Sequence, residues 1–326
     1  MAATNFFFAA AVPLLLYWLL APLYIPPQQL HKAWMKKNVI VTGASQGIGK
    51  AIVMELVQRD ANIVIVSRTK TKLEAVREEA LRRFPETKSK IIVLAADLSA
   101  EWTCRKFMEN ALNALDNEPL DALILNHIAK TNVGFWLVNS DQTSDSTAIS
   151  AISMEKQKQN QEQKEMGSLL NHPFESNFFS YVWLTTFAMD SLKLSAEGGQ
   201  IGVVSSLAGY AGTPKTAVYS ATKHALNGFF DALRTELKMM DPNSNISITI
   251  ANIGATDTEG AREYAMGEMS DKITWDPADK AAKQIIMGVA NRNRAIFHPH
   301  HLIFPSVILN QLFPQLMDFI LKNIIQ

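Results

Sequence analysis

The stretch that decides the fold is residues 38–49, NVIVTGASQGIG. A β-rich run leads into three closely spaced glycines, and a helical pattern, KAIVMELVQRD, follows at 50–60. Glycines after a strand allow a tight turn and a close approach of the backbone to a diphosphate, and the helix amino terminus supplies N–H donors. The stretch therefore predicts a dinucleotide-binding loop, with these contact residues: Gly43, Ser45, Gln46, Gly47, Ile48 and Gly49.

Further β-rich runs follow along the chain, and helix-like segments lie between most of them. The runs are residues 62–67, 90–95, 122–126, 201–206 and 247–253. Strands that are apolar throughout and are separated by helices indicate a parallel sheet covered on both faces. We expect an α/β fold, a doubly wound parallel sheet of Rossmann type, in a single domain over residues 31–326.

The composition supports a globular domain and excludes several classes. The chain has 326 residues, a net charge of +0 and 48% hydrophobic residues, which is enough for a large core. Basic and acidic residues are equal in number, so the sequence lacks the excess positive charge that is typical of nucleic-acid-binding proteins. A single cysteine, Cys104, excludes an internal disulfide framework and a cysteine-rich zinc site.

The end of the second predicted strand indicates which cofactor the loop takes. Ser67 and Arg68 stand where an acidic residue would bind the ribose hydroxyls of NAD. Arg68 offers a planar cation to a 2′-phosphate, which favours NADP(H), although an ordinary surface arginine is the other interpretation. Asp97 and Leu98 close the third strand, where they either hold the adenine or, in the case of Asp97, cap a nearby helix.

Three residues near the fifth predicted strand have the types and spacing of a catalytic site. Tyr219 and Lys223 are four residues apart in a strongly helical stretch, so they share one helix face. Ser206 ends the strand IGVVSS, 13 residues before Tyr219, and strand carboxyl ends are where open α/β sheets place their chemistry. Together with the upstream TGxxxGxG pattern, this set identifies the chain as resembling the short-chain dehydrogenase/reductase family.

The resemblance extends from residue 38 to about residue 294. Within the family, several stretches are similar to one particular branch. LILNHIAKT (123–131), ESNFFSYVWLT (175–185), VVSSLAG (203–209), YSATKHALNGFF (219–230) and IGATDTEGA (253–261) resemble the 11β-hydroxysteroid dehydrogenase type 1 branch. This resemblance implies a membrane-anchored, homodimeric, NADP(H)-dependent oxidoreductase that interconverts ketones and secondary alcohols on lipophilic substrates such as steroids.

The same resemblance assigns roles to further residues. Asn177 would hold a water that links Lys223 to solvent, and Asn126 would support the cofactor side of the sheet. Beyond the sixth strand, Gly254, Thr256 and Thr258 would contact the nicotinamide carboxamide. Tyr219 and Lys223 would also touch the cofactor.

The residues themselves suggest how such a reaction proceeds. A tyrosine near its ordinary pKa of about 10 transfers protons slowly at neutral pH. We expect the Lys223 ammonium and the oxidised nicotinamide to lower the pKa of Tyr219, so that it acts as acid in reduction and base in oxidation. Ser206 would hydrogen-bond the carbonyl oxygen of the substrate.

Departures from the branch leave the substrate open. Gln46 replaces a lysine that contacts phosphate in the branch, and the tail at 301–326 is apolar and interrupted by proline. The tail would shape the substrate pocket, form a dimer or touch a membrane. The alternatives to a steroid are a retinoid or a long-chain keto-lipid, and the non-enzymatic alternative is a lipid-surface scaffold with the same fold.

Two segments lie outside the alternating pattern. Residues 6–25 carry no charge and are just long enough to cross a bilayer, so we expect a membrane anchor within residues 1–30, spanning or hairpin-like. Residues 139–166 are polar and cannot bury enough apolar surface to fold alone, which predicts a surface insertion or a partner-binding helix.

Topology signals point in opposite directions. Lys32, Lys36 and Lys37 follow the apolar run and favour a cytosolic domain under the positive-inside rule. Asn245 begins the only Asn-x-Ser/Thr sequon, which, with the resemblance, favours the lumen of the endoplasmic reticulum. We expect an endoplasmic reticulum membrane protein with a slight preference for the lumen. His298, His300 and His301 have no carboxylate at ligand spacing beside them, so we predict no metal site.

Overall fold

The computed structural model describes residues 26–129, 170–212, 216–264 and 274–325. The expected anchor segment at 6–25 and the polar stretch at 139–166 lie outside these ranges. Among the described residues, no helix combines the length and the apolar character needed to cross a membrane.

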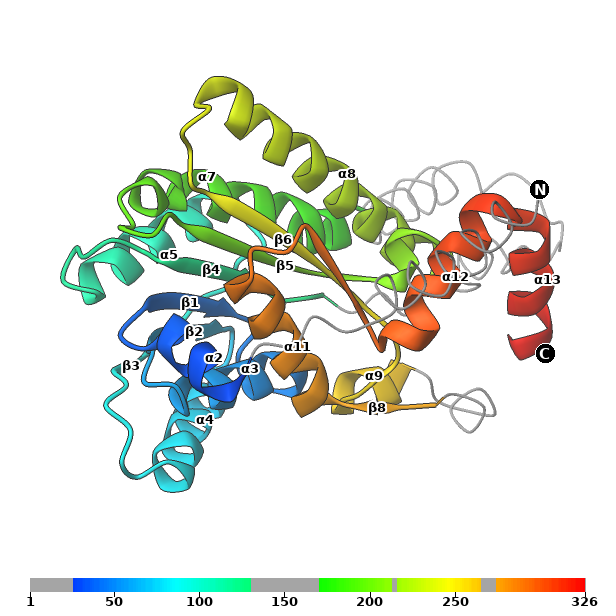
Figure 1. The fold of residues 1–326 in the computed structure, drawn as a ribbon. Helices are drawn as coiled ribbons and strands as arrows, with labels where there is room; N and C mark the ends of the chain where they lie inside the picture. Colours follow the sequence, from blue (N-terminus) through cyan, green and yellow to red (C-terminus); the bar gives the residue numbers. More distant parts are fainter. Residues whose placement is uncertain (1–25, 130–169, 213–215, 265–273, 326) are drawn as a thin grey trace, which may run out of the picture.

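A parallel sheet of seven strands forms the centre of the molecule (Figure 1). The strand order is β3-β2-β1-β4-β5-β6-β9, so the chain winds outward from β1 first in one direction and then in the other. The strands are β1 (Asn38–Thr42), β2 (Asn62–Ser67), β3 (Ile91–Ala95), β4 (Ala122–Leu125), β5 (Gln200–Ser206), β6 (Ser247–Ile253) and β9 (Ala295–His298). The predicted doubly wound fold and its six strands are confirmed, with ends that differ by at most one residue.

The seventh strand, β9, is not among the six strands predicted from the sequence, although a strand end is expected at the FHPHH stretch, residues 297–301. It is only four residues long and pairs with β6 at the edge of the sheet, with Ile253 opposite His298. Its position depends on pairing with a strand that is distant in sequence, because so short a run has no clear period of its own. The strand places His298 at the carboxyl edge of the sheet.

Helices cover both faces of the sheet (Figure 1). One face carries α2 (Pro27–Trp34), α3 (Gly47–Val57), α4 (Lys70–Arg83) and α11 (Ala278–Ala290), and the other carries α5 (Glu101–Ala114), α7 (Ser180–Lys193) and α8 (Ala217–Met240). Successive residues of a strand point to opposite faces, so Val39 packs in the first core and Ile40 in the second. Leu30 and Trp34 of α2 are each 1% exposed, which shows that this short helix belongs to the first core.

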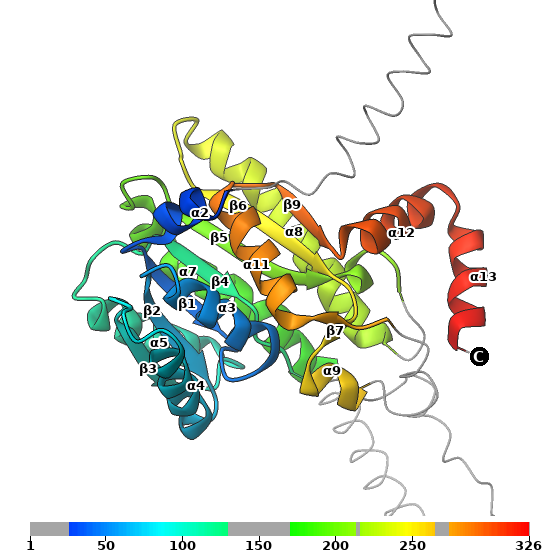
Figure 2. The same ribbon diagram turned by 60° about the horizontal axis from the view of Figure 1, so that its bottom comes forward.

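The remaining elements lie at the carboxyl edge of the sheet or extend beyond it (Figure 2). They are a π-helical turn (Glu175–Phe179), a 3-10 turn (Leu207–Gly209), β7 (Thr256–Asp257), α9 (Glu259–Tyr264), β8 (Asp276–Pro277), α12 (His300–Leu312) and α13 (Pro314–Ile325). The apolar tail predicted from the sequence is thus two helices, and large apolar side chains such as Leu312 and Phe319 are exposed on them.

Candidate functional site

All strands of the central sheet are parallel, so their carboxyl ends bring the predicted site residues to one edge. Thr42 ends β1, Asn126 follows β4, Ser206 ends β5 and Gly254 follows β6. Ligands of open α/β sheets bind at this edge, because the strand order reverses there and opens a crevice. Residues as far apart in sequence as Thr42 and Gly254 therefore face one region.

The glycine loop has almost no room for side chains. A Cβ atom on Gly49 would lie 2.1 Å from the carbonyl oxygen of Gly43. Gly43 and Gly47 have φ values of 64° and 55°, a region that favours glycine. The loop can therefore pass close to a ligand, and α3 begins directly at Gly47.

Two contacts connect this loop to other parts of the predicted site. The Asn126 side-chain amide donates to the carbonyl oxygens of Thr42 and Gly43, each at 3.3 Å. A Cβ on Gly47 would lie 3.0 Å from Cγ2 of Thr258, which places Thr258 directly against the loop. The structure therefore brings Asn126 and Thr258 to the predicted cofactor loop.

The end of β2 provides further polar groups. Arg68 is exposed, and the buried Ser67 hydroxyl has no hydrogen-bond partner within the described part of the chain. A cavity of about 360 Å³ adjoins the glycine loop, and Ser45, Gln46, Lys50 and Lys72 are among its lining residues. Sequence analysis missed the two lysines, although Lys50 lies one position after Gly49 and could have been found as a cation on the first turns of α3.

The two consecutive residues predicted to bind the cofactor at the end of β3, Asp97 and Leu98, have different surroundings in the structure. Asp97 is exposed, and its carboxylate accepts a hydrogen bond from the Ser99 amide at 3.1 Å. The N-cap of α5 is Ala100, so Asp97 does not cap that helix. Leu98 is 5% exposed and packs in the second core, which leaves little of its side chain for an adenine ring.

Ser206 and Tyr219 lie together, as their spacing predicted. Tyr219 is on the first turn of α8, and a hydrogen bond with Ser206 acts to lower its pKa. Burial acts more strongly in the opposite direction, so the pKa of Tyr219 is raised above its ordinary value. The neighbouring Ser205 points into the protein and is 3% exposed, which leaves Ser206 as the serine at the site.

Lys223 lies beneath Tyr219 and is almost completely buried. Its Nζ is 5.8 Å from the centroid of the Tyr219 ring and donates to the carbonyl oxygen of Val204 at 2.9 Å. Burial lowers the pKa of Lys223 to about 7. In the protein alone, the pKa of Tyr219 is therefore raised, because burial outweighs the hydrogen bond with Ser206. The expected lowering by Lys223 together with an oxidised nicotinamide concerns the cofactor-bound protein and stays a prediction.

Asn177 occupies the middle of the π-helical turn and is fully buried. Its Oδ1 accepts from the Ala129 amide at 2.6 Å, and its Nδ2 donates to the Ala129 carbonyl at 3.2 Å. Both ends of the Asn177 amide therefore hold the backbone after β4. Single-turn π-helical segments occur often at functional sites, because the extra residue re-aims a side chain.

His127 directly follows Asn126 and is expected from the sequence to pack or to form hydrogen bonds; the structure places it beside the site. Its two ring nitrogens lie 2.8 Å from Thr42 Oγ1 and 2.7 Å from Ser180 Oγ. Burial and the nearby Lys223 lower the pKa of His127 to about 3, so the ring is neutral at neutral pH. Its carbonyl oxygen accepts from the Tyr181 hydroxyl at 2.7 Å, which connects β4 to α7.

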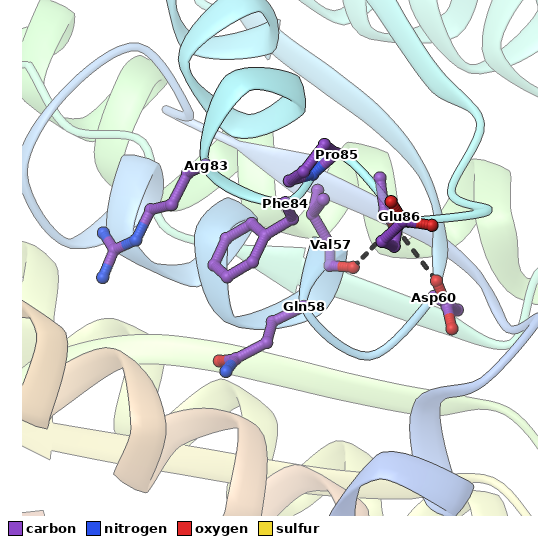
Figure 3. Close-up of a pocket in the computed structure, with 8 residues that line it drawn as sticks. Val57, Gln58, Asp60, Arg83, Phe84, Pro85 and Glu86 are labelled. Carbon is purple, nitrogen blue, oxygen red and sulfur yellow. Dashed lines mark hydrogen bonds between the residues drawn. The ribbon is translucent and has the colours of Figure 1, made fainter.

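A second hollow lies at the opposite edge of the sheet (Figure 3). It has a volume of about 300 Å³ and is formed by the end of α3 and the turn after α4, including Val57, Asp60 and Phe84. None of the predicted site residues lines it, so the predicted chemistry belongs to the carboxyl edge.

The burial of Lys223 predicts a specific dependence of stability on pH. A lysine has an ordinary pKa of 10.5, and the folded value is about 7, so between these values the unfolded chain binds one proton more than the folded chain. The free energy of unfolding should therefore rise with pH in this range. Relative to Lys223→Met, we expect the unmodified protein to gain up to about 1.4 kcal/mol per pH unit in denaturant titrations.

Lys238→Met, at an exposed position of the same helix, is the matched control. An identical pH dependence for the unmodified protein and Lys223→Met would contradict the prediction.

Comparison with known proteins agrees with this geometry. A family model described as short chain dehydrogenase matches residues 37–268. A hydroxysteroid 11-beta-dehydrogenase 1-like protein from Gallus gallus is 34% identical over 273 residues, which cover 84% of this chain and 80% of the relative. Hydroxysteroid 11-beta-dehydrogenase 1-like protein A from Xenopus laevis is 31% identical over 290 residues, covering 88% and 86%.

Solved structures share the fold at lower identity. A short chain dehydrogenase from Burkholderia cenocepacia J2315 in complex with NADP aligns with a TM-score of 0.62 at 21% identity, over 81% of this chain and 97% of that one. A short-chain dehydrogenase from Sphingobium yanoikuyae in complex with NADPH gives a TM-score of 0.63 at 20% identity, over 86% and 95%. The resemblance to the 11β-hydroxysteroid dehydrogenase type 1 branch is thus confirmed, and the chain belongs to the short-chain dehydrogenase/reductase family.

Proposed function

We propose that the protein is an NADP(H)-dependent oxidoreductase that interconverts a ketone and a secondary alcohol on a lipophilic, steroid-like substrate. The observation that carries the proposal is the Ser206–Tyr219 pair above the buried Lys223, at the same edge of the sheet as the glycine loop. A scaffold of the same fold has no need for a tyrosine hydroxyl, a serine hydroxyl and a buried lysine in this arrangement.

The residues present fit a phosphorylated dinucleotide. The loop at Gly43 and Gly49 is a cradle that a Cβ atom would fill, and the unpartnered Ser67 hydroxyl stands where the adenosine ribose would be expected. Arg68 would hold the 2′-phosphate, with Lys50 and Lys72 as nearby cations. Gln46 stands where the branch has a lysine, and Lys50 is paired with Glu79 at 2.7 Å, so the preference for NADP(H) would rest mainly on Arg68. When bound, the cofactor supplies or accepts a hydride.

The proton needed on the carbonyl oxygen would come from Tyr219. Burial raises its pKa, so the hydroxyl is protonated at neutral pH and can act as the general acid in reduction. Ser206 would donate to the same oxygen and stabilise the charge that develops on it. Lys223 would hold the nicotinamide ribose and stabilise the tyrosinate in oxidation, and Asn177 would support the return of protons from solvent.

The lipophilic nature of the substrate is supported by apolar groups beside the site. A Cβ on Gly254 would lie 2.6 Å from Cδ1 of Ile303, so α12 packs directly on the segment after β6. The Phe297 ring contacts those of Tyr210 and Phe304, with centroid distances of 6.1 and 5.4 Å. The relatives are named for hydroxysteroid dehydrogenases, which act on compounds of this character.

The homodimer that the resemblance implies is also part of the proposal. Trp102 on α5 is 73% exposed, and the Arg105 guanidinium lies 4.3 Å from the Phe187 ring centroid on the outer face of α5 and α7. An exposed aromatic and arginine surface of this kind suits a second copy of the chain.

Tyr219→Phe should abolish most of the turnover without disturbing the fold. Only the hydroxyl is lost, and general acid–base catalysis contributes about 10²–10⁴-fold, so we expect a rate loss of that size in NADPH oxidation over a panel of lipophilic ketones. Cofactor affinity should be unchanged. Tyr181→Phe is the matched control, since it removes a buried hydroxyl that donates to His127 and should cost about 1 kcal/mol of stability but little turnover. Near-normal turnover in Tyr219→Phe would place the acid elsewhere.

Arg68→Ala should remove most of the preference for NADPH over NADH. A charge-assisted contact with the 2′-phosphate is worth about 1.5–3 kcal/mol, and the loss should appear in the ratio of the two dissociation constants. Arg77→Ala on α4, which removes a guanidinium paired with Glu74, is the control. Equal affinities for NADPH and NADH in the unmodified protein would refute the cofactor assignment.

We also propose that residues 1–30 anchor the protein in the endoplasmic reticulum membrane, with the folded domain in the lumen. Support comes from the uncharged stretch at 6–25 and from Asn245, which is exposed in the turn before β6. Expression in microsomes should give an endoglycosidase-sensitive mobility shift that disappears in Asn245→Gln. The absence of a shift, with digestion of the domain by protease added to intact microsomes, would place the domain in the cytosol.

A further inference from the structure

The segment at 254–256 is held from two sides by residues that are distant in sequence. The Gly254 amide donates to the carbonyl oxygen of His298 at 2.7 Å, and the Asp276 amide donates to the carbonyl oxygen of Ala255 at 3.0 Å. Thr256 pairs with Asp276 in the short β7–β8 ladder. Asp276 and His298 therefore bracket three consecutive residues.

The side chains of the two bracketing residues are bonded to each other. Nε2 of His298 and Oδ2 of Asp276 form a hydrogen bond, which closes a ring through β6, β7, β8 and β9. His298 is 8% exposed, and the side chain of Asp276 is 20% exposed. The pair is thus mostly protected from water, which strengthens the hydrogen bond between a carboxylate and an imidazole.

The charged groups around the pair are consistent with a neutral imidazole that donates to a carboxylate. Burial is the main cause that lowers the pKa of His298, and Lys280 and His301 act in the same direction, while Asp276 opposes them. The ammonium of Lys280 lies 4.0 Å from the other carboxylate oxygen of Asp276.

The hydrogen bond between Asp276 and His298 stabilises a part of the chain that has few other constraints. Between β7 and β8 it makes an excursion that includes α9, and the ladder at the base of this excursion is only two residues long. A two-stranded pairing of that length is not stable by itself, and closing the loop costs entropy. A buried side-chain hydrogen bond at the base supplies the missing constraint.

We propose that Asp276 and His298 are positioning residues that fasten the 254–256 segment so that it holds the nicotinamide half of the cofactor. The inference rests on the proposed function, because it takes the bound molecule to be NADP(H). The adenosine half is expected at the end of β2 and the glycine loop, which contacts Thr258 beyond the segment but none of residues 254–256 in the close approaches of its glycines. Loss of the pair therefore affects only molecules that carry a nicotinamide.

A binding experiment on the full chain in detergent, with two ligands, distinguishes binding of the nicotinamide half of the cofactor from binding of the adenosine half. NADPH reports on both halves, and adenosine 2′,5′-bisphosphate reports on the adenosine half alone. His298→Met removes the N–H donor at similar volume, His298→Gln retains a side-chain N–H donor, and Asp276→Leu removes the acceptor. We expect the dissociation constant of NADPH to rise about tenfold in His298→Met and in Asp276→Leu.

The other variants make the result specific to the hydrogen bond. His298→Gln should restore most of the NADPH affinity, and the double variant His298→Met with Asp276→Leu should be no weaker than either single variant, because the two side chains act through one contact. Affinity for adenosine 2′,5′-bisphosphate should stay within about twofold in every variant. Thr87→Val, which removes a hydrogen bond to Asp60 near the hollow of Figure 3, is the control for a general loss of polar contacts.

Each outcome decides between the alternatives. Unchanged NADPH affinity in the Met and Leu variants would overturn the inference and leave the proposed function intact. An equal loss of affinity for both ligands would also overturn it, since the pair would then support the whole fold. Failure of the unmodified protein to bind NADPH would contradict the proposed function itself, and the inference would fall with it.

Discussion

The close approach of Gly49 to Gly43 is the constraint on which the rest of the site depends. With 2.1 Å between a Cβ on Gly49 and the Gly43 oxygen, no other residue is possible at Gly49 without moving the loop. The Asn126 amide, which donates to Gly43, occupies the remaining space and ties β4 to β1. The turn from β1 into α3 is therefore rigid, and its backbone faces the crevice where the strand order reverses.

Burial governs the chemistry at the other side of this crevice. Lys223 is buried and Tyr219 is half-buried, and the loss of contact with water favours the neutral form of each group. A neutral, protonated Tyr219 suits the reduction of a ketone. The positive charge of an oxidised nicotinamide would favour the tyrosinate that the reverse reaction needs. Under the proposed function, the protein would provide the acid, and the redox state of the bound cofactor would decide how readily the proton leaves.

The substrate side of the site is built from late parts of the chain. The strand β9 completes the sheet, and α12 follows it and packs against Gly254 through Ile303. The pair of Asp276 and His298 joins the ends of β8 and β9 at the same place. Under the proposed function, the cofactor and substrate regions would consequently share the segment after β6.

By itself, the sequence determined the fold class, six strands and the spacing of Ser206, Tyr219 and Lys223, because these depend on local periodicity and on glycines that no other residue replaces. It also predicted which edge would carry the chemistry, since parallel strands place all their carboxyl ends together. Only the tertiary structure decided the partner of Lys223, the bridging role of His127 and the existence of β9. Each depends on pairing between distant segments and on the extent of burial, neither of which local periodicity records.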